Sequence, residues 1–374
     1  MIRDAMLLVA ALREPETTRA LDANGWIALI AMARAEQLIG TLAHRLQGEA
    51  VSAKIADILD DARIGAEHQK RSALWEADCA ARALADYDGK VVLLKGTAYV
   101  AAGLSAGEGR HIGDLDILVA REDLPVVEAL LLEKGRWEWV KEDAYDDAYY
   151  RDHMHELPPL IHKDRDRMID VHHTILPLTA GPRPDAWGLL GASVKPSPLQ
   201  GRGLGEGEST ASVGQLDSPP SQPSPLKRGG LQILCSTDMT IHCATHLIAD
   251  GDLAGGLRNL WDMHCLLTEF FATDSDYFAK LQQRATHHQL WPAVHRAARL
   301  AHELYGTDIP KEWQGWYRQD KWFIRRLTAR EGWGRPTRKF TRLIFYVRSH
   351  LLRMPPLMLA RHLFTKWRKA KDKS

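Results

Sequence analysis

Two aspartates lie one residue apart inside an apolar segment of the chain. The segment RHIGDLDILV spans residues 110–119 and places Asp114 and Asp116 among leucine, isoleucine and valine residues. Residues i and i+2 of a β-strand face the same side, so the two carboxylates are expected to point together. Two anions this close repel each other, and their burial is costly unless a cation lies between them. The spacing therefore predicts a divalent-cation site, and carboxylate oxygens favour Mg²⁺ (or Mn²⁺).

A third carboxylate lies in a second apolar segment. MIDVHHTI, residues 168–175, carries Asp170; by the same period of two His172 shares its strand face, and His173 faces away. Three carboxylates on adjacent strands can hold two metal ions for phosphoryl or nucleotidyl transfer. One ion orients a triphosphate, and the other lowers the pKa of the attacking hydroxyl. Asp170 is also a candidate general base, and His172 is a candidate for substrate contact.

A glycine-containing turn upstream is suited to receive phosphates. LLKGTAY, residues 93–99, places Gly96 and Thr97 after a predicted strand and before a predicted helix. Glycine permits close approach of the backbone to a phosphate, and the start of the following helix favours an anion. Lys95 and Arg110 are candidates to neutralise phosphate charge. These four residues are therefore the predicted nucleotide-binding residues.

The elements that must position these residues form a strand-rich centre between helical regions. Amphipathic spacing of apolar residues predicts helices over residues 1–87 and again over 231–334. Strand and helix patterns alternate over 88–194, which predicts a compact α/β unit that carries the candidate site. Residues 335–374 form a basic amphipathic tail with 12 Lys/Arg and one acid, against 37 basic and 47 acidic residues in the rest of the chain.

One segment has the composition of a disordered insertion. Residues 195–230 contain six prolines, seven glycines and six serines among 36 residues, without a periodic apolar pattern. Such a segment buries too little apolar surface to compensate the loss of chain entropy on ordering. An inert insertion is the preferred interpretation, and a proline-rich docking site is the alternative.

The succession of these motifs resembles a known family. Strand–KGT–helix, then RHIGDLDILV, then IDVHHTI is similar to the uncharacterised bacterial nucleotidyltransferase family of the polymerase-β-like superfamily. Its pattern of a glycine with a small residue, two acids one residue apart and a third acid on a later strand falls on Gly96–Thr97, Asp114, Asp116 and Asp170. The threonine and the longer gap before the first aspartate depart from that pattern. The likeness covers most of the chain except the 195–230 segment.

The resemblance implies a fold and an activity. The implied fold is α+β (α/β): a small mixed-sheet nucleotidyltransferase core flanked by N- and C-terminal helical regions. The implied activity is Mg²⁺-dependent transfer of a nucleoside monophosphate from an NTP to an acceptor hydroxyl at a two-metal carboxylate site, with Asp114, Asp116 and Asp170 as metal ligands and catalytic residues. The family leaves the acceptor unspecified.

Several alternatives remain open at this point. A toxin-like nucleotidyltransferase that modifies tRNA or protein has a similar LLKGTAY and GDLDI pattern. A catalytically inactive nucleotide-binding scaffold, or a glycosyltransferase that holds a metal and a sugar nucleotide with a D-x-D motif, would also explain the aspartate pair. In the simplest alternative, the aspartates only cap the backbone or pair with arginines.

Composition adds expectations about environment and partners. The sequence contains no run of 18 apolar residues, so we expect no transmembrane helix. Its four cysteines are scattered, which suits reduced thiols, and we therefore expect a cytoplasmic protein. The basic tail predicts contact with an anionic membrane surface, which would be the inner membrane, or with RNA or an acidic partner. The alternative is a packed helix whose basic face is solvated. His242 and His246 have a spacing that can bind zinc, but without a further ligand motif packing against the catalytic unit is preferred.

Overall fold

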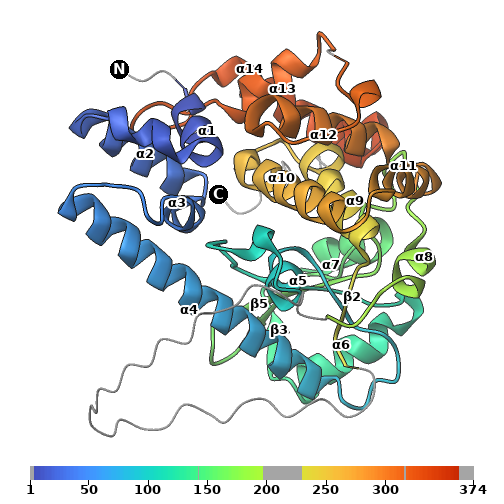
Figure 1. Ribbon diagram of the computed structural model, residues 1–374. Coiled ribbons are helices and arrows are strands. Elements are labelled where there is room, and N and C mark those ends of the chain that lie inside the picture. Colours follow the sequence, from blue (N-terminus) through green and yellow to red (C-terminus); the bar gives the residue numbers. More distant parts are fainter. Residues whose placement is uncertain (1–3, 142, 197–229, 316, 362–374) are drawn as a thin grey trace, which may run out of the picture.

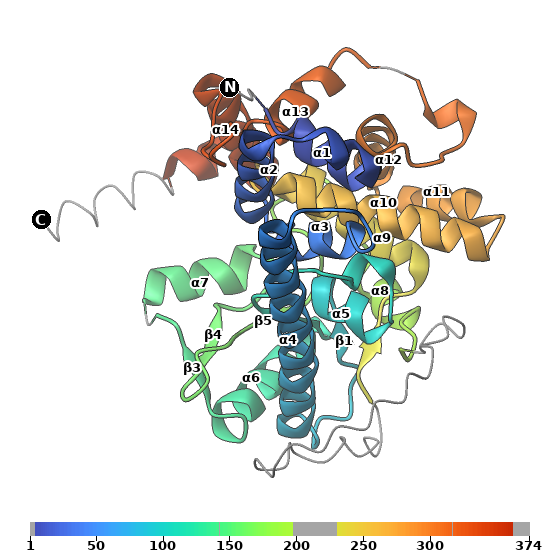
Figure 2. The same ribbon diagram turned by 60° about the vertical axis from the view of Figure 1, so that its left-hand side comes forward.

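The computed structural model describes residues 4–141, 143–196, 230–315 and 317–361 (Figures 1 and 2). Within these residues, a mixed sheet has the strand order β3-β4-β5-β2-β1-β6. The strands are β1 (Val92–Leu93), β2 (Leu115–Leu118), β3 (Trp137–Trp139), β4 (Leu160–His162), β5 (Met168–His172) and β6 (Gln232–Ile233). The predicted α+β class with a mixed sheet is confirmed.

The pairing around β2 determines the geometry of the site. β2 pairs with β5 in parallel, and their register places Asp116 directly opposite Asp170. On its other side β2 pairs with β1 in the antiparallel direction, and β1 pairs in parallel with β6. β4 and β5 pair in the antiparallel direction, and the polar DRDR segment, residues 164–167, joins them. All four residues of β2 are buried, which explains its apolar sequence.

Helices surround this sheet and form the larger part of the molecule. The N-terminal helices are α1 (Met6–Arg13), α2 (Ala23–Ala35), α3 (Ile39–Arg45) and α4 (Ala53–Ala83). Those interspersed with the strands are α5 (Lys95–Ala101), α6 (Leu124–Glu133), α7 (Ala144–His153) and α8 (Ala186–Gly191). The C-terminal helices are α9 (Ser236–Ala244), α10 (Gly256–Thr273), α11 (Tyr277–His287), α12 (Trp291–Tyr305), α13 (Asp320–Leu327) and α14 (Lys339–Arg353).

Beside a small separate cluster of Ala73, Val100 and Ile112, one large hydrophobic core joins these regions. Its buried residues run from Ala5 in the N-terminal part through the strands to Phe345 in α14. The long helix α4 passes alongside α5 and the sheet (Figure 2), and only one face of it is buried. None of the described helices is long and apolar enough to cross a membrane.

The predicted insertion lies almost entirely outside the described residues, which stop at Pro196 and resume at Gly230. The chain resumes with β6, whose backbone bonds to Val91 and Val194 hold it at the edge of the sheet. The predicted basic tail contributes α14, and residues 362–374 also lie outside the described part.

Candidate active site

The three predicted carboxylates converge at the β2–β5 pair. Asp114 immediately precedes β2 and is exposed, Asp116 is buried within β2, and Asp170 is half-buried on β5. One oxygen from each carboxylate lies within 4.8 Å of the other two. Because parallel register places Asp116 beside Asp170, and the strand period returns Asp114 to the same side, three anions share one small region.

The charges in this cluster are only partly balanced. Burial, followed by the charges of Asp116 and Glu156, raises the pKa of Asp170 to about 7. Burial alone would also raise the pKa of Asp116, but the Lys95 ammonium and a hydrogen bond from His172 hold it well below its usual range. Asp116 therefore stays ionised, while Asp170 lies in a field that disfavours its negative charge.

Two cationic or polar groups bracket Asp116. The Nζ of Lys95 lies 2.5 Å from the Oδ1 of Asp116, and the Nε2 of His172 lies 3.0 Å from the same oxygen. Burial lowers the pKa of Lys95, but the charges of Asp116, Asp114 and Asp170 raise it by more, so the ammonium is retained. Lys95 and His172 thus fix the orientation of the Asp116 carboxylate.

The backbone of Lys95 is itself unusual. Its φ of +47° lies in the left-handed region, which costs a non-glycine residue about 1–2 kcal/mol. Lys95 is the first residue of α5, so Gly96 and Thr97, which the sequence pattern predicts to lie before the helix, form part of its first turn. The ion pair with Asp116 is one interaction that offsets the strain.

Gly96 and Arg110 are packed directly against each other. A Cβ added at Gly96 would lie 2.0 Å from an Nη atom of Arg110. The guanidinium of Arg110 is buried, lies over the ring of Tyr99 and donates to both carboxylate oxygens of Asp262 on α10. The structure therefore places Arg110 between Gly96 and Asp262, and not in the cluster of Asp114, Asp116 and Asp170. A phosphate contact by Arg110 stays a prediction, and it would require this ion pair to open.

Replacing Gly96 by alanine is expected to destabilise the fold by about 1–3 kcal/mol, because the new methyl group would displace a guanidinium that Asp262 holds in place. Urea unfolding measures this change. Gly65 on the exposed side of α4 has no atom near the position of its Cβ, so Gly65→Ala should stabilise the helix by up to about 1 kcal/mol. Equal effects of the two substitutions would contradict the packing argument.

Thr97 offers a buried polar atom to the site. Its side chain is 1% exposed, and among the described residues its Oγ1 has no hydrogen-bond partner. Thr97 and Asp114 line the same small hollow in front of β2. An unpartnered buried hydroxyl is energetically costly, so its position beside a carboxylate favours a bound polar ligand.

A cavity of about 270 Å³ opens beside Asp170. It is lined by residues that include Lys95, Tyr150, Glu156, His172, His242 and Arg353. The carboxylate of Glu156 lies 3.5 Å from the Nδ1 of His172 and 3.7 Å from the Nε2 of His155. These three residues are a second group whose ligand atoms lie within 4.8 Å of one another.

Glu156 and His155 are residues that the sequence patterns did not single out. The backbone of Glu156 forms an isolated antiparallel β-bridge with His172 at the end of β5. This bridge brings Glu156 close to the strand that carries Asp170. A signal was present, because the apolar segment HELPPLIHK, residues 155–163, begins with two ionisable residues and shortly precedes the strand of Asp170. That the two segments pair in this register is not visible in either segment alone.

The predicted histidine pair lies at the same cavity. His242 is buried on α9, and His246 follows it in a π-helical turn, Thr245–Asp250. Burial and the positive charge of Lys95 lower the pKa of His242 to about 3, so it is neutral. Both histidines pack against the strand-rich unit, as the preferred interpretation expects. His173, by contrast, points away and contacts the carbonyl of Met154.

Comparison with known proteins agrees with this geometry. A family model described as an uncharacterised nucleotidyltransferase matches residues 22–306, from just before α2 to just after α12. This match includes the turn at Gly96 and all three carboxylates. No curated protein and no solved structure matches the chain. The chain therefore belongs to the family of uncharacterised nucleotidyltransferases.

Proposed function

We propose that the protein transfers a nucleoside monophosphate from an NTP to an acceptor hydroxyl, with Mg²⁺ or Mn²⁺ as cofactor. The observation that carries the proposal is the convergence of Asp114, Asp116 and Asp170, whose carboxylate oxygens lie within 4.8 Å of one another. Family membership supports an NTP as substrate. The acceptor is a matter for experiment.

The residues present fit a hard divalent cation. All three candidate ligands supply carboxylate oxygens, which Mg²⁺ and Mn²⁺ prefer. The raised pKa of Asp170 reflects excess negative charge that a bound cation would balance. The unpartnered hydroxyl of Thr97 would gain a partner from a metal-bound nucleotide. When bound, Mg²⁺ would polarise the phosphoryl oxygens and acidify the acceptor hydroxyl.

The chain's own residues position the nucleotide and the ligands. His172 and Lys95 orient Asp116 through contacts with the same carboxylate oxygen. We propose that Lys95, Gly96 and Thr97 contact the triphosphate, since the Lys95 ammonium lies beside the carboxylates and the buried Thr97 hydroxyl lacks a hydrogen-bond partner among the described residues. In this proposal Arg110 is a positioning residue, because its pair with Asp262 supports Gly96 from behind.

Thermal unfolding tests the binding part of the proposal. Each NTP with Mg²⁺ is compared with the same NTP and EDTA, and sugar nucleotides are included. A matching NTP at about 100 times its Kd is expected to add about 2.7 kcal/mol of stability, or a rise in Tm of about 3–4 °C. A shift with sugar nucleotides alone would favour a glycosyltransferase, and no shift with any NTP would contradict the proposal. Mass spectrometry of extract incubated with labelled NTP would then identify the acceptor.

A further inference from the structure

Helix α14 exposes its apolar face. An amphipathic helix of a globular protein normally turns that face toward the core. In α14 the buried residues are Thr341, Phe345 and Ser349, two of which are polar. An apolar stripe on the opposite side is exposed instead, and its residues recur at helical spacing: Phe340 (70%), Leu343 (57%), Ile344 (40%), Val347 (46%) and Leu351 (49%).

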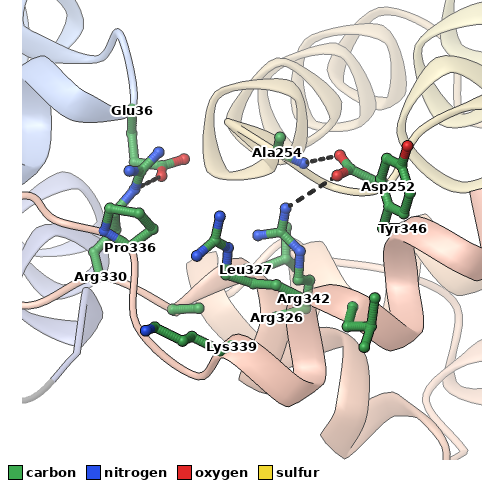
Figure 3. Close-up of a pocket in the computed structure, with 12 residues that line it drawn as sticks. Glu36, Asp252, Ala254, Arg326, Leu327, Arg330, Pro336, Lys339, Arg342 and Tyr346 are labelled. Atoms are coloured by element: carbon green, nitrogen blue, oxygen red, sulfur yellow. Dashed lines mark hydrogen bonds and ion pairs between the residues drawn. The ribbon is translucent and has the colours of Figure 1, made fainter. Parts of the chain in front are cut away.

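A basic cleft lies along one edge of this stripe (Figure 3). Its volume is about 380 Å³, and Leu343 belongs to both the cleft and the stripe. The cleft is lined by four cations, Arg326, Arg330, Lys339 and Arg342, and by two acids, Glu36 and Asp252. Arg330 donates to Glu36 at 2.6 Å. Within the described part of the chain, neither Lys339 nor Arg342 forms an ion pair, so the cleft carries excess positive charge.

Arg326 lines this cleft, and its guanidinium group is incompletely paired. Its side chain is 9% exposed, and its closest carboxylate oxygen, on Asp252, is 3.7 Å away. Its Nε is buried without a hydrogen-bond partner among the described residues. A buried cation of this kind needs an anion, and guanidinium groups favour phosphate. The cleft therefore suits a phosphate group that arrives from outside.

We propose that the stripe and the basic cleft form a docking surface for an anionic phospholipid membrane. A headgroup phosphate would enter the cleft, and the stripe would enter the boundary between headgroups and acyl chains. Trp333, 64% exposed, lies in the turn closed by the Arg330–Pro336 bridge at the cleft rim, where an aromatic side chain suits a membrane interface. Four of the five stripe residues are aliphatic and offer no ring for a base to stack on, which favours a bilayer over RNA as the occupant.

The location of α14 agrees with this role. In Figure 1 it lies with α13 on the side of the molecule away from the sheet, beyond the segment that matches the family. The charge of residues 335–374, 12 basic against one acidic, complements an anionic surface. The last residue of α14, Arg353, lines the candidate active-site cavity. Because the stripe begins in the first turn of α14 and the cavity lies at its last residue, the two are separated by about one helix length, roughly 20 Å.

Vesicle co-sedimentation of the full chain tests the proposal. The protein is expected to pellet with phosphatidylcholine vesicles that contain phosphatidylglycerol, not with phosphatidylcholine alone, and to be released by high salt. Leu343→Asp with Val347→Asp should weaken binding about tenfold or more, since it places charge in the apolar stripe. Lys339→Gln or Arg342→Gln should each weaken it about fivefold. The matched control is Ile64→Asp on α4, because the Ile64 side chain is 67% exposed but lies outside the stripe. This variant should leave vesicle binding unchanged.

Four results would overturn the proposal. The first is no pelleting with phosphatidylglycerol vesicles at low salt, and the second is equal pelleting of the stripe variants and wild type. The third is a solution dimer that Leu343→Asp abolishes, since a second copy would then cover the stripe. The fourth is stabilisation by inorganic phosphate without any vesicle binding, which would make the cleft a site for a free anion. Unchanged thermal unfolding of the variants checks that each one folds.

Discussion

Replacement of Asp114 by asparagine is expected to abolish Mg²⁺-dependent nucleotidyl transfer while leaving the fold intact. Asp114 is exposed and precedes β2, so the substitution removes a metal ligand without burying a new group. Loss of one ligand should cost several kcal/mol of transition-state stabilisation, or about a thousandfold in rate. Single-turnover transfer from labelled NTP measures the rate, and urea unfolding in EDTA measures the fold.

Two comparisons sharpen this prediction. Asp57→Asn removes an exposed aspartate of α4 and should change neither rate nor stability. Asp116→Asn should also remove activity, but it should destabilise the protein, because Lys95 and His172 would lose their carboxylate partner. Asp114 is therefore the cleaner probe. Retention of full transfer by Asp114→Asn would refute the metal site.

Asp262→Asn is expected to give the largest loss of stability, about 3–5 kcal/mol. Asp262 is 2% exposed and accepts from the guanidinium of Arg110, which is 7% exposed. The substitution leaves a buried cation without its counter-charge, and the attraction lost is far larger than that of an exposed pair. Urea or guanidinium unfolding measures the change through the midpoint at a constant slope.

An exposed ion pair provides the control. Asp60 pairs with Arg63 on the surface of α4, so Asp60→Asn should cost at most about 1 kcal/mol. The double variant Arg110→Met with Asp262→Leu removes both charges together and should be more stable than Asp262→Asn. If Asp262→Asn unfolds no more easily than Asp60→Asn, the Arg110 pair does not support the turn at Gly96.

The sequence alone determined the parts of the site that depend on local periodicity. The period of two in a strand places Asp114 and Asp116 on one side, and the KGT turn follows from a strand that meets a helix. The apolar surroundings of Asp170 marked it as a third strand carboxylate. The strand positions of Asp116 and Asp170 were predicted correctly because each depends on neighbours within a few residues, where backbone geometry leaves few choices.

Only the tertiary structure decided which of these groups meet, and what else meets them. The β2–β5 register places Asp116 opposite Asp170, and packing of α10 gives Arg110 a partner 152 positions away. The left-handed backbone of Lys95 directs its ammonium to Asp116, although its position in the sequence equally suited a phosphate. Such contacts depend on how elements that are distant in the sequence pack together. Composition and residue spacing carry no information about that packing. The outward face of α14 shows the same limit, because periodicity fixes the two faces of a helix but only packing decides which one is covered.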